Sequence, residues 1–164
     1  WVFLLESPLL EKDKSIAFYT KLGFEISREK DIYIAKESRF IILLNPATTS
    51  QPTLHVYGAK ETKSFFGPSG TLIHLNKEKC PYTLGQKQSI LGNYYGVSLE
   101  TASLQDSYSL WRKLGFKGTY SPTPGWIELN KAGQHLSIQQ SNQCPHLFFN
   151  PSLTFFNGQK TRKS

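Results

Sequence analysis

Short apolar stretches separated by turn residues run through most of the chain, and they predict strands. The alternation of apolar and polar positions is clearest in "GVSLET" (96–101), where Val97, Leu99 and Thr101 would lie on one face of a strand. Two segments depart from this pattern and predict helices, because their apolar residues recur every three or four positions. These residues are Ile16, Tyr19 and Leu22 in the first segment, and Leu104, Tyr108, Trp111 and Leu114 in the second.

The two predicted helices belong to an internal repeat. "SIAFYTKLGFEI" (15–26) aligns without a gap with "SYSLWRKLGFKG" (107–118) at a constant offset of 92 residues, and both contain "KLGF". Each copy follows a strand-like stretch and precedes two more, "DIYIAK" and "RFIILLN" in the first and "GWIELN" and "HLSIQQS" in the second. Because the flanks repeat as well, we predict a βαβββ module that is present twice.

Capping residues mark the helix ends. Ser103 and Asp106 have the spacing of a capping box, which predicts the start of the second helix. Gly23 and Gly115 stand where a left-handed C-terminal cap is needed, so both helices should end there, and the Phe that follows each glycine should begin the next strand.

A weaker repeat follows each module. "QPTLHVYGAK" (51–60) and "NPSLTFFNGQK" (150–160) share a Pro, a small hydroxyl residue, a Leu and an alternating strand, so they are interpreted as first strands of further modules. The second module then spans only 28 residues, 52–79, with almost no room for a helix. Either it is naturally reduced or residues are absent from the sequence near "AKETKSFF".

We therefore predict an α+β fold of repeated βαβββ modules, whose sheets curl into half-barrels with the helices outside. Two domains are expected, 1–79 and 94–164, joined by a linker at 80–93, with the second domain incomplete at its C-terminus. The alternative is a single domain made from the two full modules and decorated by the hairpin at 52–79.

Composition narrows the classes of partner. The 164 residues are 38% hydrophobic and 19% charged, as in a folded globular protein, and no apolar run reaches the length of a membrane span. The net charge of +7 comes from basic residues scattered beside acids, with one basic run, "GQKTRKS", so we expect neither nucleic acid nor membrane as a partner. Cys80 and Cys144 are too few for a disulfide framework, which favours a reducing, cytoplasmic compartment.

Three stretches, "SIAFYTKLGF", "PTLHVYG" and "GPSGTLIHL", together resemble the vicinal oxygen chelate superfamily, which includes glyoxalase I, bleomycin-resistance proteins and extradiol dioxygenases. The first is similar to the helix after strand 1 of that family, and the third to its closing turn and strand. The resemblance covers most of the chain apart from the linker and the C-terminal tail.

In metal-dependent members, the resemblance implies a His or Gln in a module's first strand and a Glu in its last strand. The first-strand positions here fall near Trp1, Thr53, Gly96 and Ser152, and the last-strand positions near Ile42, His74 and Ser137. Only His74 and the nearby His55 could coordinate a metal, and a site of this kind normally needs three or more protein ligands. We therefore expect no metal and no cofactor, with a divalent metal as the alternative.

The resemblance then implies a metal-free protein that binds a small molecule in a cupped sheet, in the manner of bleomycin-resistance proteins. The predicted ligand-binding residues are His55, His74, Tyr57 and Trp126, and the predicted ligand is aromatic or anionic. A histidine on a solvated strand face without any function is the open alternative for His74. The alternative function is a metal-dependent lyase or dioxygenase whose further ligands lie outside this sequence or on a partner subunit. Catalysis is left open, as is assembly into a homodimer.

Overall fold

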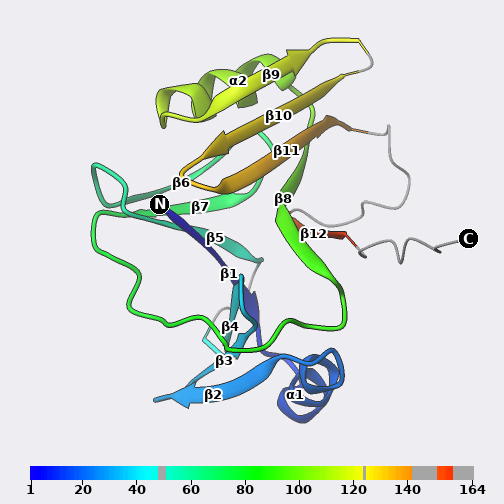
Figure 1. Ribbon diagram of the computed structural model, residues 1–164. Helices are drawn as coiled ribbons and strands as arrows, with labels where there is room; N and C mark the ends of the chain where they lie inside the picture. The colour runs from blue at the N-terminus through cyan, green and yellow to red at the C-terminus, as the bar shows by residue number, and fades with distance from the viewer. Residues whose placement is uncertain (48–50, 124, 142–150, 157–164) are drawn as a thin grey trace, which may run out of the picture.

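The described strands form two separate sheets, the first built from the N-terminal half of the chain and the second from the C-terminal half. The computed structural model describes residues 1–47, 51–123, 125–141 and 151–156 (Figure 1). Sheet A has seven strands in the order β2-β3-β4-β1-β5-β7-β6, and sheet B has five in the order β12-β8-β11-β10-β9. The predicted α+β class is confirmed, and the described strands close no barrel.

The elements of sheet A come first in the chain. They are β1 (Val2–Pro8), α1 (Lys12–Lys21), β2 (Glu25–Glu29), β3 (Ile32–Lys36), β4 (Ile41–Asn45), β5 (Thr53–Tyr57), β6 (Lys63–Phe66) and β7 (Leu72–Asn76). The elements of sheet B are β8 (Asn93–Thr101), α2 (Leu104–Lys113), β9 (Lys117–Ser121), β10 (Trp126–Lys131), β11 (Gln134–Gln140) and β12 (Ser152–Phe156). No described helix has the length and apolar character that a membrane crossing requires.

The two halves use the same strand pairing, as the internal repeat predicts. β1 runs parallel to β4 and antiparallel to β5, and β8 runs parallel to β11 and antiparallel to β12. The chain passes from β5 to β6 without a helix, so the second module is reduced in this chain. The two full modules lie in different sheets, and the 52–79 segment extends sheet A. The division into two domains stays a prediction.

The predicted helix ends are confirmed, but Phe24 and Phe116 each lie one residue before the strand that they were expected to begin. The Ser103 hydroxyl accepts a hydrogen bond from the backbone N–H of Asp106 at 3.3 Å, which satisfies one of the free donors of the first turn. Gly23 and Gly115 have φ angles of +89° and +94°, the left-handed conformation that ends a helix at low cost only for glycine.

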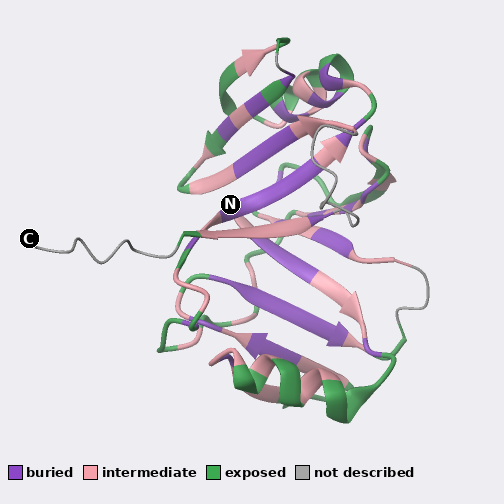
Figure 2. Ribbon diagram, turned by 90° about the vertical axis from the view of Figure 1, so that its right-hand side faces the viewer, coloured by how far each residue is buried: buried purple, intermediate pink, exposed green. Residues whose placement is uncertain are grey.

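The two helices differ in burial although their sequences repeat. α1 has no buried residue and lies at the outside of sheet A, whereas α2 buries Leu104, Ser107 and Trp111 (Figure 2). The Trp111 ring meets Phe3 of sheet A edge-on, with 6.0 Å between the ring centroids, and also contacts Phe116. Side chains of both sheets therefore share one hydrophobic core, in which Trp111 joins α2 to sheet A.

The opposite face of sheet A carries a second, smaller core. Leu4, Ile34, Ile41 and Leu43 are buried there. Cys80 and Tyr82, which follow β7 in the chain, pack against them. We call this side of sheet A the linker face, because the segment that was predicted to be a plain linker covers part of it.

Candidate functional site

A row of polar side chains crosses the linker face of sheet A. Strand pairing places Ser64 of β6 opposite His74 of β7, and His74 opposite His55 of β5. Paired residues of neighbouring strands point to the same side of a sheet, so the register brings the two histidines together. Their ring centroids lie 5.3 Å apart, and Nε2 of His55 lies 3.3 Å from Oε1 of Glu6 on β1.

The two histidines are held differently. Nδ1 of His74 is hydrogen-bonded to the hydroxyl of Ser64. Both ring nitrogens of His55 are buried, and neither has a hydrogen-bond partner among the described residues, because the contact with Glu6 is close but not aligned as a hydrogen bond. Burial lowers the pKa of His74, and the neighbouring His55 lowers it further, so the His74 ring is neutral near pH 7.

The described side chains of the linker face do not provide the ligands of a metal centre. Glu6, His55 and His74 are the nearest approach to a ligand set on the linker face, but one nitrogen of His74 already bonds Ser64. Across the part of the chain that the structure describes, no three His, Cys, Asp or Glu side chains are grouped so as to hold a metal ion. The metal centre that the resemblance implies does not fit these residues, and we derive no metal-dependent step.

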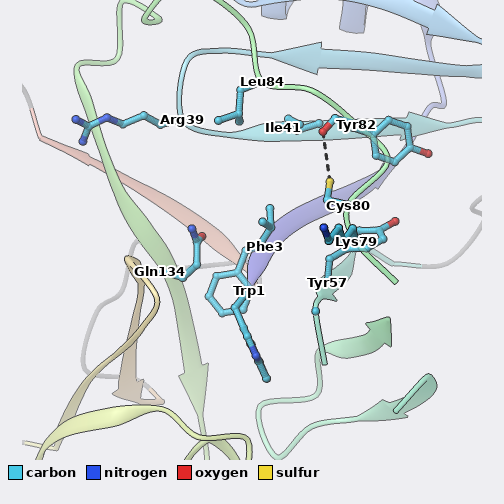
Figure 3. Close-up of a pocket in the computed structure, with 12 residues that line it drawn as sticks. Trp1, Phe3, Arg39, Ile41, Tyr57, Lys79, Cys80, Tyr82, Leu84 and Gln134 are labelled. Carbon is cyan, nitrogen blue, oxygen red and sulfur yellow. Dashed lines mark hydrogen bonds between the residues drawn. The ribbon is translucent and has the colours of Figure 1, made fainter. Parts of the chain in front are cut away.

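A cavity of about 440 Å³ opens at the end of the linker face, where β1 begins and β5 ends. Its wall is mainly aromatic and aliphatic, made by Trp1, Phe3, Ile41, Tyr57, Tyr82 and Leu84 (Figure 3). Polar side chains reach it from three other segments: Arg39 before β4, Lys79 after β7 and Gln134 at the start of β11. We call it the ring cavity; its size lies within the usual range for sites that bind small molecules.

Three ionisable groups on the linker side of the ring cavity, Tyr57, Cys80 and Tyr82, keep their protons at neutral pH. Burial, followed by the effects of Tyr82, Cys80 and Glu6, raises the pKa of Tyr57 to about 12, so its hydroxyl keeps its proton. Burial also raises the pKa of Tyr82 and of the Cys80 thiol. Cys80 is a free cysteine whose thiol donates to the carbonyl of Tyr82 at 3.5 Å, so it is a poor nucleophile here. The second cysteine, Cys144, lies outside the described residues.

The linker wall of the ring cavity is fixed by a buried glutamate. Glu37 is fully buried, and its two carboxylate oxygens accept hydrogen bonds from the backbone N–H groups of Arg39 at 2.7 Å and Ser89 at 3.2 Å. Its own carbonyl accepts from the N–H of Gly85, and a further backbone bond joins Ser38 to Lys87. The linker is therefore attached to the turn between β3 and β4, and this attachment positions Tyr82 and Leu84.

Sheet B has its own cluster of polar side chains, centred on Glu128 of β10. The carboxylate accepts hydrogen bonds from the Ser137 hydroxyl at 2.6 Å, from the Trp126 indole N–H at 3.0 Å and from the Tyr95 hydroxyl at 3.1 Å. Burial and the hydrogen bond to Glu128 raise the pKa of Tyr95. Three donors from three strands thus hold one carboxylate in place.

The four residues predicted to bind ligand do not form one site. His55, His74 and Tyr57 lie together on the linker face, with the His55 and Tyr57 rings stacked at 6.1 Å, but only Tyr57 lines the ring cavity. Trp126 lies on sheet B, 39% exposed, where it bonds Glu128. Their role in binding stays a prediction.

Sequence reasoning missed the residues that complete the ring cavity, above all Arg39, Tyr82, Leu84 and Gln134. Arg39 lies shortly before β4 and Gln134 is the first residue of β11, and their positions carry no periodic signal. Only Tyr82 and Leu84 could have indicated from the sequence that the linker packs against a sheet. Two large apolar side chains within the short segment "CPYTLG" are unusual for a connection that is only solvated.

The paired βαβββ modules, the open sheets and the module order give this protein a vicinal oxygen chelate-like fold. A solved structure described as a xylose isomerase-like TIM barrel/4-hydroxyphenylpyruvate dioxygenase fusion protein matches 84% of this chain with a TM-score of 0.52 and 15% identity. This chain covers 31% of the length of that protein. At this identity the likeness concerns the fold alone.

A second solved structure, SMU.1112c, matches 85% of this chain and 97% of its own length at 17% identity, but its TM-score of 0.25 is too low to support an argument. No family model and no curated protein matches the sequence.

Proposed function

We propose that this protein binds a small aromatic molecule in the ring cavity, without a metal. The observation that carries the proposal is the cavity itself, about 440 Å³ and lined by the aromatic residues Trp1, Phe3, Tyr57 and Tyr82. Aromatic walls favour flat apolar ligands, because ring–ring contacts add to the gain from removing apolar surface from water.

The polar groups around this wall support binding over catalysis. The Tyr57 hydroxyl and the Cys80 thiol both have raised pKa values, so neither supplies a base or a nucleophile at neutral pH. The Tyr57 hydroxyl can donate a hydrogen bond to a ligand. We infer a site for recognition or sequestration, and the vicinal oxygen chelate-like fold is compatible with this function without specifying it.

The proposal is tested with the neutral dye N-phenyl-1-naphthylamine, whose fluorescence rises in apolar surroundings. The wild-type chain should show saturable binding with one site. Tyr57→Ala should weaken the affinity about tenfold, since losing the contact of one ring removes roughly 1.4 kcal/mol. Leu84→Trp should weaken it as well, because a larger side chain at a half-exposed position of the wall occupies the cavity.

The matched control is Tyr33→Ala, which removes a half-buried tyrosine from β3 of the same sheet, outside the ring cavity. It should leave the affinity within twofold of wild type. Dye binding that is absent, or that survives both Tyr57→Ala and Leu84→Trp in folded protein, would overturn the proposal.

A further inference from the structure

A second cavity adjoins the ring cavity. It has about 400 Å³ and lies between the turn before β4 and the strands β8 and β11; we call it the rim cavity. Three side chains line both cavities, namely Arg39, Leu84 and Gln134. The far wall of the rim cavity includes Tyr95 and His135, whose rings are stacked with centroids 4.6 Å apart. The two cavities are therefore neighbouring compartments with a shared boundary between sheet A and sheet B.

The Arg39 side chain at this boundary carries an unpaired charge. Within the described ranges, its guanidinium makes no hydrogen bond and no ion pair; the bond recorded for Arg39 comes from its backbone N–H to Glu37. Figure 3 shows the guanidinium turned away from Trp1 and Tyr57, with Leu84 and Gln134 on the same side of the cavity. The charged end of Arg39 is thus presented beside the ring cavity, not inside it.

Two carboxylates of this region, Glu37 and Glu128, turn their oxygens to donors other than the Arg39 guanidinium. Both oxygens of Glu37 accept bonds from backbone amides. Glu128, beyond Tyr95, accepts bonds from three neutral side chains. A guanidinium offers several N–H donors in a fixed plane that matches the two oxygens of an acidic group, so an unpaired one beside an aromatic cavity is suited to an anion.

We propose that the ligand is an aromatic acid, with its ring system in the ring cavity and its acidic group at Arg39, facing the rim cavity. This inference rests on the proposed function and adds the chemical class of the ligand. Carboxylate, sulfonate and phosphate share the required chemistry, two or more oxygens with negative charge. The amide of Gln134 lies on the same boundary and can donate a further hydrogen bond.

Two dyes that differ by one acidic group test this assignment. N-phenyl-1-naphthylamine is neutral, and 1-anilinonaphthalene-8-sulfonate carries a sulfonate on the same ring system. Both are titrated against wild type, Arg39→Gln, Arg39→Lys and a control, Lys117→Gln. Lys117 is exposed at the start of β9 and lines neither cavity, so its removal changes the net charge alone. Circular dichroism confirms that each variant is folded.

Arg39→Gln should weaken sulfonate binding about fivefold, the upper range for an ion pair at an exposed arginine, and should leave the neutral dye within twofold. Arg39→Lys should recover part of the loss, because the charge remains without the planar donor pair. Lys117→Gln should change neither affinity by more than twofold. For each dye, the affinity of a variant is divided by the affinity of the wild type, so the different hydrophobicity of the two dyes does not affect the comparison.

The outcomes separate the two proposals. The aromatic-acid assignment is overturned if Arg39→Gln leaves the affinity for the sulfonate dye unchanged, or if Lys117→Gln weakens that affinity as much as Arg39→Gln does. If the neutral dye still binds saturably, the proposed function stands. Failure of both dyes to bind the wild-type chain overturns both. A loss confined to the sulfonate dye in Arg39→Gln supports both.

Discussion

Removing the Glu37 carboxylate, which attaches the linker to the turn between β3 and β4, should destabilise the protein. Glu37 is fully buried, and each of its oxygens accepts a backbone amide, from Arg39 on one side and from Ser89 of the linker on the other. In Glu37→Ala both amides lose their acceptor while the surrounding structure keeps them from water. Each hydrogen bond to a charged group contributes about 1.5–3 kcal/mol.

The sum of two such bonds overestimates the net effect. Burying a carboxylate without a basic partner carries its own cost, and alanine removes that cost together with the bonds. We therefore expect Glu37→Ala to lower the free energy of unfolding by about 3 kcal/mol. Glu37→Gln should lower it by about 1.5–2 kcal/mol, because the amide oxygen can still accept one bond while its NH₂ group faces the other donor.

Urea unfolding followed by tryptophan fluorescence measures these differences, with the slope against urea compared between variants to confirm a common unfolding transition. Glu78→Gln, at an exposed position, is the control and should stay within about 0.5 kcal/mol of wild type. Amide exchange at Ser89 should quicken in Glu37→Ala before global unfolding does, since the linker is released first. If both Glu37 variants match the control, the carboxylate does not hold the linker and the reasoning is wrong.

Three further predictions follow from the core, the polar row and the metal question. Trp111→Ala should cost about 3–5 kcal/mol in urea unfolding, whereas Phe18→Ala in α1, where the side chain is 57% exposed, should cost no more than about 0.5 kcal/mol; equal costs would contradict the unequal burial of the two helices. Burial lowers the pKa of His74 in the folded state, so below about pH 6.5 the unfolded state binds more protons and the free energy of unfolding should fall as the pH drops. This fall should be shallower in His74→Gln, and the same slope in both proteins would contradict the prediction. Adding EDTA should change neither the melting temperature nor the affinity for N-phenyl-1-naphthylamine. A clear loss of either would show that a bound metal contributes to stability or to binding.

The sequence by itself determined the local elements and their order. Periodicity distinguished helices from strands, Gly23 and Gly115 ended both helices, and Ser103 began the second, because capping and alternation depend on residues a few positions apart. The 92-residue repeat then predicted the shared strand pairing of the two halves. Alternation also placed His55 on the same face of its strand as Thr53, but it could not tell how far His55 lies from any cavity.

The tertiary structure alone decided which distant segments meet. The two helices have matching sequences, yet only α2 buries side chains, among them Trp111, which packs against Phe3 of sheet A. The ring cavity exists because the linker crosses the face of sheet A and is attached there through Glu37, which lies 52 positions from Ser89 in the chain. Periodicity shows which side chains share a face, but the segment that covers this face is selected by packing and hydrogen bonds across the whole molecule. Arg39, Tyr82 and Gln134 could therefore be recognised as neighbours only in the folded chain.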